Sequence, residues 1–92
     1  MEIITNQHIE KEAIAQLAFE ISAVQPQPQL QQKLEQATTL GNLYHNKVKI
    51  FFHALQGNFV VETTIWASSS AYICLKGGIT LPVQAITALQ LI

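Results

Sequence analysis

Arginine and aspartate are both absent from this 92-residue sequence, and only 12% of its residues are charged. Without arginine, the chain lacks the planar guanidinium that binds phosphate and carboxylate groups with two hydrogen bonds. Without aspartate, it lacks one of the two carboxylates that serve in catalysis and metal binding. About a quarter of the residues of a typical globular domain are charged. The composition therefore argues against several enzyme classes and predicts a weakly charged surface, of the kind that a second subunit would cover.

Charge of both signs is nearly balanced, with a formal net charge of −1. Residues 1–40 contain five glutamates and two lysines, whereas residues 41–92 contain three lysines and one glutamate. The overall field is too weak to attract nucleic acid or an acidic membrane, although the two halves differ in sign.

Cysteine occurs once, at Cys74, which excludes a disulfide framework within the chain and suits a reducing compartment. The first residues lack the basic region of a signal peptide, and Glu20 interrupts the apolar stretch AIAQLAFEISAV. We therefore expect a soluble, cytoplasmic protein without membrane association. We also expect one domain over residues 1–92, with a helical segment at 1–40 and a β-barrel-like segment at 41–92.

Apolar side chains recur at helical spacing near the N-terminus and predict a helix from Thr5 or Asn6 to about Val24. The far side of this helix would carry a second apolar face, made of Ala15, Phe19 and Ala23. That face is a candidate contact between subunits.

The next segment, QPQPQLQQKLEQ at residues 25–36, is interpreted in two ways. Its glutamines are typical of a linker, whereas the spacing of Leu30, Leu34 and Ala37 favours a second helix. Pro28 would open this helix and Gly41 would end it.

From residue 44 onward the sequence alternates like β-strands. Val48, Ile50 and Phe52 would form an inner face. A turn at Gln56-Gly57 would pair these three with Ile65, Thr63 and Val61, in that order, on a long, bent second strand. The outer face would then place Lys47 beside Trp66, Lys49 beside Thr64 and Phe51 beside Glu62.

Three further segments complete the predicted sheet. AYICLK is a strand, Gly77-Gly78 is a tight turn and ITLP is a strand ended by Pro82. VQAI would form one helical turn and ITALQLI a last strand. The predicted fold class is α+β, with one or two N-terminal helices followed by a small, strongly bent antiparallel sheet or barrel of about five strands.

The order hairpin, long second strand, short strand, glycine turn and "ITLPVQAI" resembles the small SH3-like and Sm-like β-barrels, including the Rho-binding antiterminator type. The pair "VETTIWA" and "LKGGITLP" also looks like a group of short bacterial proteins without an assigned function. The first resemblance implies a fold and an RNA-binding alternative. Only Asn58 and Lys76-Gly77 occupy places comparable to the RNA-binding residues of Sm-type proteins, and arginine is missing.

No residue pattern predicts catalysis, a metal site or a cofactor. His45 and His53 would lie about 26 Å apart on one strand, too far to share a metal ion. The serines of WASSSAY lack a base and an orienting acid, so they are interpreted as turn residues. We therefore expect no catalytic residues, no metal and no cofactor.

The outer strip of Trp66, Lys47, Lys49, Phe51 and Thr64 is the candidate binding site. Such a strip stacks and neutralises single-stranded nucleic acid. The alternative, which the weak charge favours, is that the first helix covers Trp66 and Phe51.

Two functional hypotheses follow from these features. The first is a non-catalytic protein–protein interaction module that forms a homo-oligomer. The alternative is an Sm-like regulator that binds RNA or the transcription machinery.

Overall fold

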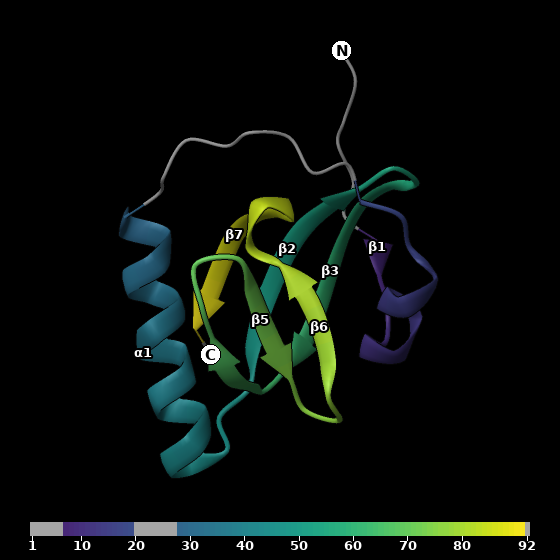
Figure 1. The fold of residues 1–92 in the computed structure, drawn as a ribbon. Helices are drawn as coiled ribbons and strands as arrows, with labels where there is room; N and C mark the ends of the chain where they lie inside the picture. The colour runs from purple at the N-terminus through teal and green to yellow at the C-terminus, as the bar shows by residue number, and fades with distance from the viewer. Residues whose placement is uncertain (1–6, 20–27, 92) are drawn as a thin grey trace.

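The structure, a computed structural model, describes residues 7–19 and 28–91 and shows an α+β fold (Figure 1). Sheet A has four strands in the order β1, β3, β2, β7, and sheet B has three in the order β4, β5, β6. Their bounds are β1 Gln7–His8, β2 Val48–Ala54, β3 Gly57–Thr63, β4 Ile65–Ser68, β5 Tyr72–Leu75, β6 Ile79–Pro82 and β7 Ile86–Leu91. The helical elements are the 3-10 helix η1 (Lys11–Gln16), the α-helix α1 (Pro28–Tyr44) and the 3-10 turn η2 (Val83–Ala85).

The predicted strand number was too low, and the strands form two sheets instead of the single bent sheet or barrel that was predicted. Part of the difference arises at Thr64, which interrupts the expected long second strand and divides it into β3 and β4. The helical turn at Val83–Ala85 and the final strand, in contrast, are confirmed.

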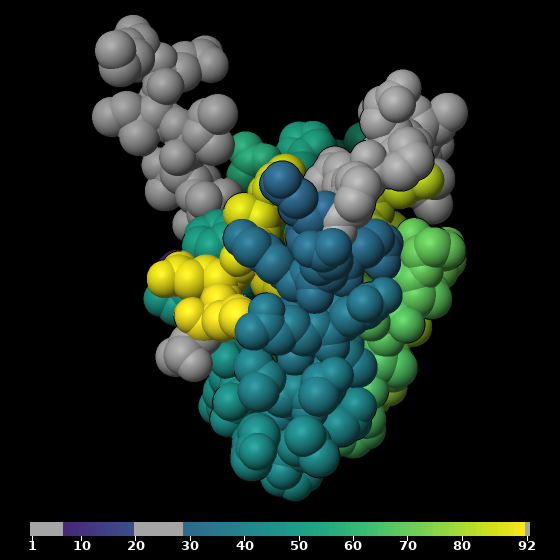
Figure 2. Space-filling model, turned by 90° about the vertical axis from the view of Figure 1, so that its left-hand side faces the viewer, coloured from purple at the N-terminus to yellow at the C-terminus, as the bar shows by residue number. Residues whose placement is uncertain are grey.

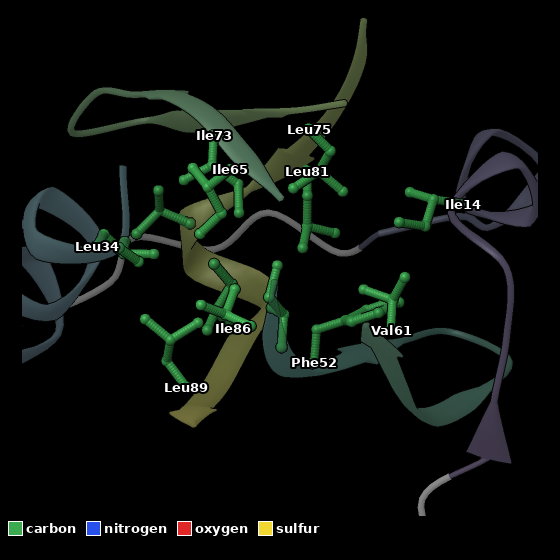
Figure 3. Close-up of a cluster of buried hydrophobic side chains, with 14 of the residues drawn as sticks. Ile14, Leu34, Phe52, Val61, Ile65, Ile73, Leu75, Leu81, Ile86 and Leu89 are labelled. Carbon is green, nitrogen blue, oxygen red and sulfur yellow. The ribbon is translucent and has the colours of Figure 1, made fainter. Parts of the chain in front are cut away.

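Sheets A and B face each other across one apolar core (Figure 3). Alternation decides which side chains enter it: in β2, Val48, Ile50 and Phe52 are buried. Sheet B contributes Ile65, Ile73, Leu75 and Leu81 from the opposite side. The two sheets therefore complete each other, because each has one apolar face to cover.

Helix α1 closes one side of this sandwich, where it contacts both β4 and β7. Figure 2 shows the helix between the C-terminal strand and the green segment of sheet B. Leu34, Ala37 and Gly41 are the buried residues of its inner face. The helix begins at Pro28, as predicted, because proline tolerates the first turn, where its missing N–H leaves no bond unmade.

The opposite side is closed by η1, which contacts β6 and β3 and inserts Ile14 into the core (Figures 1 and 3). The predicted helix over residues 5–24 is therefore wrong within residues 7–19. The edge of β3 offers backbone groups that an extended chain satisfies: β1 pairs with it in parallel, and Ile9 N–H donates to the Val60 carbonyl at 3.1 Å. Residues 20–24 lie outside the described part.

The predicted end of the second helix was also wrong, because α1 runs through Gly41 to Tyr44. His45 ends it with a positive φ of 56°, and its N–H donates to the Gly41 carbonyl at 2.9 Å. Gly41 instead permits close contact: a Cβ atom there would lie 2.5 Å from the Ile65 carbonyl oxygen.

The β2–β3 hairpin has a different register from the one predicted. Ala54 pairs with Gly57, so Leu55 and Gln56 form the turn, and Val48, Ile50 and Phe52 pair with Thr63, Val61 and Phe59. Gly57 has a φ of 143°, which suits glycine at the first residue after the turn. The shift is two residues, so it preserves the buried face while changing every outer neighbour.

Replacing Gly41 by alanine tests the contact between α1 and β4. Alanine favours the helix by about 1 kcal/mol relative to glycine. We expect the clash with Ile65 to exceed this gain and to lower the free energy of unfolding by at least about 1 kcal/mol, measured by urea denaturation. Gln36→Ala on the exposed side of α1 is the control and should change it by less than about 0.5 kcal/mol. A Gly41→Ala variant as stable as the parent would contradict the contact.

Candidate functional site

The structure distributes the predicted outer strip over three surfaces. Lys49 and Phe51 pair with Glu62 and Val60 on the outer face of sheet A. Trp66 belongs to β4 in sheet B and is 45% exposed, so neither η1 nor α1 covers it as the favoured interpretation expected. Lys47 and Thr64 belong to a third surface, a cleft that both residues line. No single surface of the described residues carries the whole strip.

The cleft has a volume of about 160 Å³ and combines residues from three parts of the chain. Glu10 and Lys11 come from the start of η1, Lys47 from the segment before β2 and Lys76 from the turn after β5. Glu62, Thr63 and Thr64 supply the remaining wall, at the point where β3 ends.

Strand register explains why Lys47 and Lys76 line the same cleft. Because Val48 pairs with Thr63 in an antiparallel hairpin, the next position outward brings Lys47 opposite Thr64. On the other side, Lys76 N–H donates to the Thr64 carbonyl at 3.0 Å. Thr64 therefore separates two lysines that are far apart in sequence.

Charges of both signs line the cleft, three lysines against two glutamates. Among the described residues, one ion pair forms: Lys11 Nζ lies 2.7 Å from Glu12 Oε1, beside the cleft. The hydrogen bond from Lys11 is the main cause that lowers the pKa of Glu12, helped by a backbone hydrogen bond. The Lys11 side chain also approaches the β5–β6 turn, since a Cβ atom on Gly77 would lie 3.3 Å from Lys11 Cε.

Two buried threonines form the inner wall of the cleft. Thr63 and Thr64 are only 5% and 4% exposed. The Thr64 hydroxyl donates to the His45 carbonyl at 3.5 Å. The Thr63 hydroxyl makes no hydrogen bond to another described residue, and it is not among the fully buried atoms that lack a partner. It therefore remains accessible, on a residue that lines the cleft.

A second surface, the aromatic face, is the outer side of sheet B. A bulge at Trp66-Ala67 interrupts the register between Ile65 and Ala67, which leaves Ile65 in the core and Trp66 outside. Tyr72, on the neighbouring strand, is 46% exposed, and Cys74 is half-buried opposite Ala67. The face therefore presents two large aromatic side chains to solvent.

The predicted subunit contact is not a helical face. Ala15 lies exposed on η1, Phe19 follows η1 and Ala23 lies outside the described residues. The Phe19 ring packs against the core, with its centroid 6.1 Å from that of Phe52. Phe19 thus fills a position within its own chain.

Several polar residues outside the cleft have structural partners. The Ser69 hydroxyl accepts the Tyr72 N–H at 3.1 Å and closes the β4–β5 turn, as predicted for WASSSAY. His53 Nδ1 lies 2.9 Å from Asn58 Oδ1 across the hairpin. Within residues 7–19 and 28–91, no three side chains of the metal-ligating types form a cluster.

Sequence reasoning missed most of the cleft. Lys11, Lys76, Glu10 and Thr63 were not grouped with Lys47 because their meeting depends on η1 and on two strand registers. The glycine turn beside Lys76 was the one local signal that this lysine lies at a strand end.

Comparison with known proteins gives no match: no family model fits the chain, and no similar curated protein or solved structure is found. In the described part of the chain, no helix has both the length and the apolar character needed to cross a bilayer.

Phe19→Ala tests whether the ring stabilises its own chain. Loss of its contact with Phe52 should lower the free energy of unfolding, measured by urea denaturation, by about 1–3 kcal/mol. The molar mass of the protein in solution, measured by light scattering, should not change, because the oligomeric state stays the same. Ala15→Ser on exposed η1 is the control. A fall in mass without a fall in stability would instead place Phe19 between subunits.

Lys11→Gln tests the origin of the Glu12 pKa. Removing the ammonium should raise this pKa toward the ordinary glutamate value, because the carboxylate form loses its hydrogen-bond donor. NMR titration of the Glu12 side-chain carboxyl measures the change, with Lys33→Gln as the control. An unchanged pKa would contradict the lysine as the principal cause.

Proposed function

We propose that the protein is a non-catalytic interaction module that self-associates through the aromatic face of sheet B. The observation that carries the proposal is the exposure of Trp66 and Tyr72, at 45% and 46%, on neighbouring strands. Aromatic side chains are enriched at the centres of interfaces, where they contribute most of the binding energy.

A second copy of the chain is the partner that fits this face. The outward-facing residues of this face include no charged side chain: they are Trp66, Ala67, Tyr72, Cys74 and Thr80. A strongly charged partner would therefore find no complement there. The same face on another copy is aromatic and uncharged to the same degree. A two-fold axis through the face would bury it on both copies at once.

The exposed area defines the role of the two rings. A buried aromatic residue covers about 150–250 Å², so the exposed fractions of Trp66 and Tyr72 correspond to roughly 70–115 Å² each. A stable interface covers about 800 Å² on each partner. The rings would therefore form its centre, and the flanking strands and the adjoining end of α1 would supply the rim.

The order of elements supports an SH3-like topology as part of the proposal. A hairpin, a strand bent at Thr64, two short strands and a 3-10 turn precede β7, which returns to pair with β2. RNA binding is not included, because Trp66, Lys47 and Lys49, which motivated it, lie on separate surfaces. A cytoplasmic location is retained as an expectation from the single, unpaired Cys74.

Replacing Trp66 and Tyr72 together by serine tests the proposed interface. The parent protein should have at least twice the monomer mass at tens of micromolar concentration, and the double variant should be monomeric, as measured by sedimentation velocity. Leu55→Ser is the matched control, because Leu55 is also exposed and apolar but lies in the β2–β3 turn.

Trp66 is the single tryptophan and reports on the same face by fluorescence. Dilution of the oligomer should shift its emission to longer wavelength as the indole becomes solvated. A parent protein that stays monomeric throughout this range would overturn the proposal, and so would a Leu55→Ser variant that dissociates as readily as the double variant.

A further inference from the structure

In the described part of the chain, the cleft holds charged groups of both signs that form no ion pair with one another. Lys47 and Lys76 lie in its wall with Glu10 and Glu62, yet no ion pair joins any of these four within the described residues. Opposite charges that share a small cleft without touching leave a gap that a ligand carrying both charges would bridge.

Thr63 adds an uncharged hydroxyl group to the same cleft. Its side chain is nineteen-twentieths buried, since only 5% of the residue is exposed, and its hydroxyl makes no hydrogen bond to a described residue. The hydroxyl is not among the fully buried atoms that lack a partner, so it is accessible from the cleft. A ligand oxygen in the cleft would therefore be able to accept its hydrogen bond.

We propose that this cleft binds a small zwitterion with an ammonium and a carboxylate group, of the α-amino acid class. The carboxylate would take hydrogen bonds from Lys47, Lys76 and the Thr63 hydroxyl. The ammonium would donate to Glu10 and Glu62. The volume of about 160 Å³ is sufficient for a few heavy atoms and for little more.

The charge balance favours a zwitterion over a simple anion. Three lysines and two glutamates give the lining a net charge of +1, and Glu12, which is paired to Lys11, offsets even this. A phosphate dianion would be attracted by the lysines but repelled by both glutamates. A neutral ligand with separated charges meets an attractive group at each end.

The test titrates the full-length protein with glycine and L-alanine and follows backbone amide shifts by NMR. Both amino acids should shift Thr63, Thr64 and Lys76 saturably. Acetate and methylammonium, which carry one charge each, should bind at least about tenfold more weakly, because each loses one set of charged hydrogen bonds. Inorganic phosphate is the comparison anion.

Two charge-removing variants test the contacts of the carboxylate and of the ammonium separately. Lys76→Gln should weaken glycine and acetate about tenfold while leaving methylammonium unchanged, and Glu62→Gln should weaken glycine and methylammonium about tenfold while leaving acetate unchanged. Lys33→Gln and Glu35→Gln are matched controls on α1 and should bind like the parent. Amide spectra of each variant establish that the fold is retained.

Three outcomes would overturn the inference. The first is the absence of saturable shifts with either amino acid at up to about 10 mM, well above millimolar affinity. The second is phosphate or acetate binding as tightly as glycine, which would indicate an anion site. The third is an unchanged glycine affinity in Glu62→Gln, which would remove the ammonium subsite. These measurements do not depend on the oligomeric state.

Discussion

The close approach of α1 to β4 determines which surfaces of this small protein face outward. At Gly41 the helix backbone lies so near Ile65 that no other side chain fits without displacement. Further contacts continue along the same line: the Asn42 amide donates to the Trp66 carbonyl at 3.2 Å, and the Thr38 and Ser68 hydroxyl oxygens lie within hydrogen-bond distance at 3.1 Å. With α1 held along this edge, the outer face of sheet B is left uncovered.

Because the chain has few charged residues, the uncovered face of sheet B presents mainly aromatic and uncharged side chains. A small domain buries a limited share of its surface, and this one relies on two helical elements, α1 and η1, to close the sides of its sandwich. Aromatic residues that a larger fold would enclose therefore remain at the surface. Three of the five lysines and two of the six glutamates gather instead where β3 ends, next to η1 and the β5–β6 turn.

Local sequence patterns predicted the buried faces but not the neighbours across strands. Alternation identified Val48, Ile50 and Phe52 as core residues, and this assignment survived a two-residue error in register because side chains repeat every two residues. The turn itself was misplaced, since Gln56-Gly57 and Leu55-Gln56 are both compatible with the flanking strands. The outer strip also depended on an unbroken second strand, and the interruption at Thr64 places Trp66 in sheet B, away from Lys49 and Phe51.

The N-terminal segment shows the limit of periodicity as a guide. Ile9, Ile14 and Leu17 have helical spacing, but the open edge of β3 and the gap beside β6 offer more burial to an extended strand and a short 3-10 helix. Tertiary contacts also account for the cleft, which no single segment encodes: Lys11 reaches it only because η1 lies against sheet B.

The strand interruption at Thr64 relates the two candidate surfaces to each other. Within four residues, Thr63 faces the cleft, Ile65 enters the core and Trp66 reaches the aromatic face. The backbone of Thr64 is held by Lys76, whose side chain belongs to the cleft. The two surfaces are therefore mechanically joined through backbone, while their side chains are separate. Side-chain substitutions on either surface leave this backbone link in place, whereas a change at Thr64 itself would perturb both surfaces.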